Sequence, residues 1–262
     1  MHLDEIVARK RKAWASTDPP YRIDRGRTRP AQPGRFAAAL VRPDVSIIAE
    51  VKPRSPSKGD LWPADRALPL ANAYREGGAR AVSVLADEPF FGGSPDLVRA
   101  VAGAVDVPVL FKDFVVDPRQ VTLAHSCDAD AVLVIARAVD DARLADILAA
   151  AGELGIDALV ETFTAGEVDR ALRAGARIVG VNNRDLDTFT VDLDNALRLR
   201  RLVPDGVVTV SESGIRDRAD VERVAAQGFD ACLIGETLLT SEDPARAVAG
   251  LVGVAAAREV AA

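Results

Sequence analysis

Hydrophobic and polar positions alternate along the chain between two kinds of segment. Short runs that are nearly all apolar are separated by longer segments in which Ala and Leu recur among Arg and Glu at helical spacing. From Val45 onward the apolar runs predict eight buried strands, over 46–50, 81–86, 107–112, 131–135, 158–161, 178–182, 207–211 and 231–235. The segments between them predict helices, among them 95–102, 141–153, 165–174, 192–202 and 218–227, and an Ala-rich helix over 244–262.

Apolar strands that are each followed by a helix indicate a parallel sheet covered by helices. Eight such units in roughly 215 residues favour an α/β fold of the (β/α)8 TIM-barrel type. The alternative is a doubly wound open sheet, which normally has a glycine-rich phosphate loop after its first strand. Lys-Pro-Arg-Ser-Pro-Ser, residues 52–57, stands at that place instead.

The N-terminal residues precede these units. Residues 2–15 have helical spacing, 16–34 are rich in Pro, Arg and Gly, and 35–41 predict a short helix. We therefore expect a helical extension, residues 1–44, packed on a barrel formed by 45–262. The extension could cover the site together with the loop 53–62, or it could close the opposite end of the barrel.

Composition narrows the class of protein. The chain has 262 residues, 48% hydrophobic and 27% charged, which suits one large domain. No apolar run approaches the roughly 18 residues of a membrane span, and the N-terminus has no secretion signal, so a cytoplasmic location without membrane contact is expected. Cys127 and Cys232 lack metal or disulfide spacing, and His2 and His125 are isolated, so no metal site is predicted. A net charge of −6 disfavours nucleic acid as a partner. The oligomeric state stays open at this point, with a monomer favoured.

Charged and polar residues stand where the predicted strands end. Glu50 and Lys52 are two apart, so on an extended strand they point to the same side, and charges there are costly to bury unless they pair or do chemistry. In a barrel the carboxyl ends of all strands meet at one rim, where active sites lie. Glycines after the last two strands fit the usual phosphate seat of this fold. The other residues at strand ends are Lys112, Glu161, Asn182 and Ser213.

Several of these segments resemble the indole-3-glycerol phosphate synthase family. They are IIAEVKPRSPSKG at 47–59, SVLADEPFFGG at 83–93, VLFKDF at 109–114, ALVET at 158–162, VGVNNRDL at 179–186, VSESGI at 210–215 and LIGETLL at 233–239, with LDEIVARKR at 3–11. The resemblance implies catalytic positions at Glu50, Lys52, Lys112, Glu161, Asn182 and Ser213. It implies substrate and phosphate contacts at Ser55, Phe91, Phe114, Arg184, Gly214, Leu233, Gly235 and Glu236. One departure is Phe163, where the family often has His.

The implied reaction is the ring closure of 1-(2-carboxyphenylamino)-1-deoxyribulose 5-phosphate, with loss of carbon dioxide and then of water, in tryptophan biosynthesis. It needs no metal and no cofactor. Lys112 is expected to donate a proton to the carbonyl, with a pKa lowered by desolvation. Dehydration needs an acid for the leaving hydroxyl and a base for a proton. Glu161 and Lys52 are both candidates, and the sequence does not say which residue has which role. Two alternatives stay open: a barrel similar to phosphoribosylanthranilate isomerase, and a non-catalytic barrel that binds a phosphorylated ligand.

Overall fold

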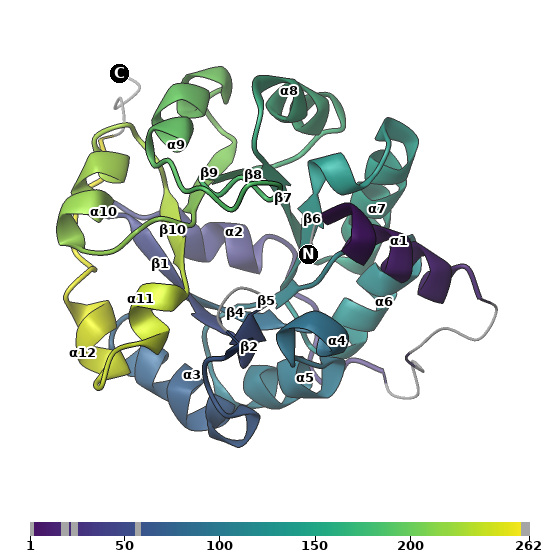
Figure 1. Ribbon diagram of the computed structural model, residues 1–262, viewed down its shortest axis with the longest axis horizontal. Coiled ribbons are helices and arrows are strands. Elements are labelled where there is room, and N and C mark those ends of the chain that lie inside the picture. Colours follow the sequence, from purple (N-terminus) through teal and green to yellow (C-terminus); the bar gives the residue numbers. More distant parts are fainter. Residues whose placement is uncertain (1–2, 17–20, 22–25, 56–58, 258–262) are drawn as a thin grey trace.

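A closed parallel barrel forms the centre of the protein. We analysed a computed structural model, which describes residues 3–16, 21, 26–55 and 59–257. Neighbouring strands pair in parallel around the ring, and helices form the outer layer (Figure 1). The (β/α)8 prediction is confirmed. The barrel strands are β1 (Ser46–Val51), β4 (Ala81–Leu85), β5 (Val109–Lys112), β6 (Ala131–Ile135), β7 (Asp157–Thr162), β8 (Ile178–Asn182), β9 (Val208–Glu212) and β10 (Ala231–Ile234).

Several of the helices that follow the strands begin at a side chain that caps them. Ser94, Asp117, Asp140, Thr164 and Asp217 each accept a backbone N–H bond from the first turn of a helix. The helices outside the N-terminal extension are α3 (Ala67–Glu76), α4 (Glu88–Phe91), α5 (Pro95–Ala104), α6 (Pro118–Ser126), α7 (Asp141–Leu154), α8 (Ala165–Arg173), α9 (Asp194–Leu199), α10 (Arg218–Ala225), α11 (Glu236–Leu239) and α12 (Pro244–Ala249). Short 3-10 turns are η1 (Ala64–Arg66), η2 (Ala136–Ala138) and η3 (Arg200–Leu202).

Two segments differ from the prediction. The segment 53–62 after β1 was predicted as a loop, but β2 (Arg54–Ser55) and β3 (Gly59–Asp60) form a small antiparallel pair within it; residues 56–58 lie outside the described part. The final helix was predicted over 244–262 and ends at Ala249; residues 258–262 of this prediction lie outside the described part. The chain then runs beside residues 43–45, where Val45 N donates to Val254 O at 2.8 Å, so tertiary pairing overrides the helix propensity of this segment.

The N-terminal extension contacts both ends of the barrel. Its first helix, α1 (Leu3–Trp14), lies at the end where the strands terminate, and its second, α2 (Arg35–Leu40), lies where they begin (Figure 1). At this second end Ala37 N donates to Asp157 Oδ2 at 3.0 Å, at the start of β7. The sequence left open whether the extension covers the site or closes the opposite end of the barrel. In the structure α1 lies at the end that holds the site, and α2 lies at the opposite end.

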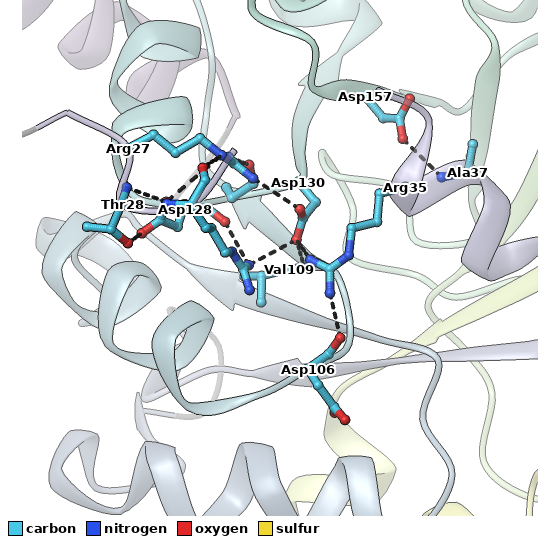
Figure 2. A network of polar contacts seen from close by, with 11 residues as sticks. Arg27, Thr28, Arg35, Ala37, Asp106, Val109, Asp128, Asp130 and Asp157 are labelled. Carbon is cyan, nitrogen blue, oxygen red and sulfur yellow. Dashed lines mark hydrogen bonds and ion pairs between the residues drawn. The ribbon is translucent and has the colours of Figure 1, made fainter. Parts of the chain in front are cut away.

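A polar network holds the connecting segment at the amino end of the strands (Figure 2). Asp130, directly before β6, lies 2.8 Å from Arg35 Nη1 and 3.3 Å from Arg27 Nη2, and it accepts a bond from Val109 N at 3.0 Å. Asp128 accepts a bond from Thr28 N at 2.9 Å. This network ties the extension to the starts of β5 and β6, far from the carboxyl ends of the strands.

None of the helices in the described ranges is long and apolar enough to cross a membrane.

Candidate active site

The carboxyl ends of the barrel strands enclose a cavity of about 570 Å³. This volume suits a substrate of small-molecule size. Every residue predicted for catalysis or binding lines this cavity: Glu50, Lys52, Ser55, Phe91, Lys112, Phe114, Glu161, Asn182, Arg184, Ser213, Gly214, Leu233, Gly235 and Glu236. Leu3 and Ile6 of α1 also line it, which places the first helix of the extension at the mouth of the cavity.

Glu50 and Lys52 form an ion pair at the end of β1, as their spacing predicts. Glu50 is only 3% exposed. Burial raises the pKa of its carboxyl, but the cations Lys52, Lys112 and Arg184 outweigh this effect and lower the pKa below its ordinary value. Gly235 lies against the same carboxylate, because a Cβ atom at this position would come within 2.5 Å of Glu50 Oε1. Glycine at 235 therefore leaves room for the Glu50 side chain.

Lys112 lies at the end of β5 between two buried carboxyl groups. Its Nζ is 3.5 Å from Glu161 Oε2 and 3.7 Å from Glu212 Oε2. Burial acts to lower the pKa of Lys112, but Glu161, Glu212 and Glu50 together raise it above the ordinary lysine value. The expected shift toward neutrality is therefore wrong, because the sequence did not reveal how many carboxylates surround this ammonium. Lys112 is a cation throughout the neutral range.

Glu212 was not among the predicted site residues. It is 2% exposed, and burial together with the neighbouring Glu161 raises its pKa to about 8, although Lys112 opposes the shift. Gly180 of β8 makes room for it, since a Cβ atom there would overlap Glu212 Oε1. The strand was expected to end at Ser211, whereas β9 continues through Glu212. The segment VSESGI at 210–215, which carries part of the family resemblance, contains Glu212 and was the signal that could have identified it.

Asn182 and the turn after β9 complete the polar floor of the cavity. Asn182 Nδ2 donates to Glu161 Oε1 at 2.8 Å, so this amide holds the carboxylate beside Lys112. Ser213 and Gly214 have positive φ angles of 66° and 85°. A Cβ atom at Gly214 would come within 2.8 Å of Val191 Cγ1, so both the backbone conformation and the packing require glycine here.

The two sides of the cavity differ in chemistry. On one side the rings of Phe91 and Phe114 lie 5.8 Å apart, a separation typical of packed aromatic pairs. On the other, Gly235 and Glu236 begin α11, and the Glu236 side chain is 49% exposed with Oε2 3.9 Å from Arg184 Nη2. A cavity lined both by an aromatic pair and by a glycine turn fits a ligand that carries an aromatic ring and an anionic group.

Phe163 is directed away from the main cavity. Its ring lies 5.8 Å from the Arg137 guanidinium carbon, and it lines a small hollow behind Glu161 and Asn182. The departure from the family pattern at this position therefore leaves the residues that line the main cavity unchanged.

Comparison with known proteins agrees with this geometry. The model of the indole-3-glycerol phosphate synthase family matches residues 3–251, nearly the whole chain. The chain belongs to the indole-3-glycerol phosphate synthase family. Among its relatives, indole-3-glycerol phosphate synthase 2 of Streptomyces coelicolor is 50% identical over 85% of this chain and 87% of the relative. Indole-3-glycerol phosphate synthase of Kineococcus radiotolerans is 45% identical over 97% of this chain and 96% of the relative.

Solved structures with low sequence identity share the fold alone. The 3-hexulose-6-phosphate synthase of Salmonella typhimurium superposes with a TM-score of 0.65 at 16% identity, covering 79% of this chain and 96% of the other. The orotidine 5'-phosphate decarboxylase of Pyrococcus horikoshii gives a TM-score of 0.61 at 14% identity, covering 78% and 96%. Both are barrels of this architecture.

Membership of the indole-3-glycerol phosphate synthase family decides between the functions left open by the sequence. The protein is a decarboxylating carbon–carbon lyase of tryptophan biosynthesis, and it forms indole-3-glycerol phosphate from 1-(2-carboxyphenylamino)-1-deoxyribulose 5-phosphate. The isomerase-like barrel and the non-catalytic barrel are set aside by the family match and by the identity to these curated synthases.

Proposed function

We propose that the two lysines of the site divide the synthase reaction, with Lys112 acting in ring closure and Lys52 in the dehydration. The aromatic carbon that bears the carboxylate attacks the ribulose carbonyl, and a bond forms between the two carbons. The carbonyl oxygen takes up a proton from the Lys112 ammonium, and the carbon–carboxylate bond then breaks to release carbon dioxide. The observation that carries this assignment is the buried Lys112 Nζ, 3.5 Å from Glu161 and 3.7 Å from Glu212. Its raised pKa keeps Lys112 charged at neutral pH, so the ammonium stabilises the negative charge that develops on the carbonyl oxygen as the proton is transferred.

The dehydration needs an acid for the departing hydroxyl and a base for a ring proton. In our proposal Lys52, held by Glu50, protonates the hydroxyl, and Glu161 removes the proton. The Asn182 amide supports this assignment because it fixes Glu161 beside Lys112. Glu212, whose pKa is about 8, would be protonated at neutral pH and could donate a hydrogen bond to a substrate oxygen.

The remaining residues bind and orient the substrate in this proposal. Phe91, Phe114 and Leu233 hold the anthranilate ring. The phosphate binds at the turns after β9 and β10, through Ser213, Gly214 and Gly235 with the charge of Arg184. Glu236 contributes its backbone N–H there, and its half-exposed carboxylate near Arg184 is compatible with this. Ser55 of β2 lies at the mouth, where the β1 loop and α1 would cover the bound substrate.

A single-turnover experiment separates the two steps. Carbon dioxide release reports ring closure, and indole fluorescence reports the completed dehydration. Lys112→Met should suppress both signals, whereas Lys52→Met should release carbon dioxide well before fluorescence appears. Simultaneous loss of both signals in the Lys52 variant would assign that lysine to ring closure instead.

We further propose that the synthase works as a monomer in the cytoplasm. All the residues assigned here to catalysis and binding meet in one cavity of a single chain, which is compatible with a monomer. The two cysteines, Cys127 and Cys232, are free and buried, as is usual in a reducing compartment. Light scattering on the purified protein tests the first statement, and a fluorescent fusion in cells tests the second.

A further inference from the structure

The helix α1 carries a buried cation at the mouth of the barrel. Lys10 is 7% exposed, and its Nζ lies 2.9 Å from Asp87 Oδ1 and 2.6 Å from Asp113 Oδ1. Both aspartates are themselves buried, at 0% and 4% exposure. One ammonium group thus joins three segments that are distant in the sequence: α1, the loop after β4 and the loop after β5.

Each aspartate also holds the backbone that carries one of the two cavity phenylalanines. Asp87 caps α4, accepting bonds from Phe90 N at 2.8 Å and Phe91 N at 3.2 Å. Asp113 accepts a bond from Phe114 N at 2.8 Å. The two aspartates therefore connect Lys10 to the backbone that carries the rings of Phe91 and Phe114.

Gln120 makes the second of these loops rigid. Its Nε2 donates to Asp113 Oδ2 at 3.2 Å and to Phe114 O at 3.0 Å. A displacement of Asp113 would therefore move the Phe114 backbone as well. Since the Phe91 and Phe114 rings contact each other, their common position depends on how closely the two loops approach.

We propose that Lys10 is a positioning residue that sets the ring-binding half of the active site by drawing these two loops together. This inference rests on the proposed function, in which Phe91 and Phe114 hold the anthranilate ring. Without the Lys10 ammonium, the buried carboxyl groups of Asp87 and Asp113 lose the cation that they share. Repulsion between two negative charges then moves the loops that carry them apart. The proposed phosphate half is built on other elements, the turns after β9 and β10.

A buried ion group is a weak source of stability in itself, because desolvation offsets most of the attraction. What the triad adds is geometry: both carboxylates reach the same ammonium only when their loops adopt this separation. The polar network at the opposite end of the barrel provides the contrast (Figure 2). There Arg35 lies 2.8 Å from Asp130 and fastens the same extension, but to the starts of the strands.

The experiment compares Lys10→Met with Arg35→Met in the full chain. Steady-state kinetics gives kcat and KM, and titrations with anthranilate and with inorganic phosphate report the two halves separately. We expect Lys10→Met to raise KM and to weaken anthranilate binding about tenfold, with kcat and phosphate affinity within about threefold of the wild type. Arg35→Met should lower the melting temperature and leave both affinities unchanged. Lys10→Met is also introduced into the double variant Phe91→Ala, Phe114→Ala. There it should cause no further loss of anthranilate affinity, because Lys10 acts on the ring only through these two side chains.

Equal loss of anthranilate and phosphate affinity would overturn the proposal, as would unchanged anthranilate binding in Lys10→Met. If Lys10→Met does not fold, Lys10→Arg replaces it in the experiment, because arginine retains the charge but changes the geometry of the ion triad. This variant must then lose anthranilate affinity, by less than tenfold, while its phosphate affinity stays unchanged. The activity of the wild type is measured first, and its absence would contradict the proposed function. Because anthranilate titration does not depend on turnover, it tests Lys10 independently of that result.

Discussion

The pKa of Glu212 leads to a prediction about how stability depends on pH. The pKa of this carboxyl rises from an ordinary 4.5 to about 8 in the folded protein because it is buried beside Glu161. The folded state therefore binds more protons than the unfolded state between these two values. Stability must then fall as the pH rises through this window, because ionising Glu212 in place costs more than ionising it in water.

Glu212→Gln removes this ionisation while keeping the shape of the protonated side chain. Each unit of pKa difference corresponds to about 1.4 kcal/mol, so between pH 5 and pH 9 the variant should gain about 4 kcal/mol of unfolding free energy relative to the wild type. The gain should be small at pH 5, where the wild-type group is protonated in the fold. At pH 9 it should reach its full value.

Urea unfolding followed by tryptophan fluorescence at intervals from pH 5 to pH 9 measures this difference. Trp14 is buried, so its emission should change on unfolding. Glu76→Gln is the control, since the Glu76 side chain is 65% exposed. Replacing this carboxylate should change the free energy of unfolding by the same amount at every pH between 5 and 9. A stability difference for Glu212→Gln that stays constant with pH would refute the account of a carboxyl held protonated by its surroundings.

Three further changes test other parts of the site. Lys112→Ala should lower turnover by about 10²–10⁴-fold with a smaller effect on binding, the usual range for a positioned acid; a variant within about threefold of wild type would remove Lys112 from the mechanism. Gly235→Ala should reduce kcat by about tenfold or more, because the new Cβ displaces the Glu50 carboxylate from Lys52; unchanged kcat would show that Glu50 need not be held there. Deleting residues 1–41 should raise KM and lower the melting temperature together, because α1 lines the cavity and α2 packs at the other end; a normal KM would argue against a covering role for α1.

The barrel could be predicted from the sequence because its strands are buried on both faces. All six residues of β1 are buried, so its middle, residues 47–49, appears as a short apolar run and not as alternating apolar and polar positions. The polar residues that interrupt such runs at their ends, Lys112 and Asn182 among them, were then assigned correctly to one cavity. Strand order and the carboxyl-end rule were sufficient for that step.

What the sequence could not provide was the environment of each charge. The pKa of Lys112 depends on three carboxylates from three strands, and their distances follow only from the closed barrel. The ion triad of Lys10 joins α1 to two loops. All three segments match the family, but the sequence does not show that these three side chains meet. The final segment was misassigned because Ala-rich composition favours a helix, while its backbone pairs with residues 43–45.

The most direct test of the account is the reaction itself. The purified protein is mixed with 1-(2-carboxyphenylamino)-1-deoxyribulose 5-phosphate, and indole fluorescence and carbon dioxide are recorded together, with Lys112→Ala beside the wild type. We expect the wild type to release one carbon dioxide for each indole-3-glycerol phosphate formed, without added metal or cofactor, and the variant to show both signals strongly reduced. A folded wild-type protein that leaves this substrate unchanged would contradict the assigned activity, and an equally active variant would contradict the central role of Lys112.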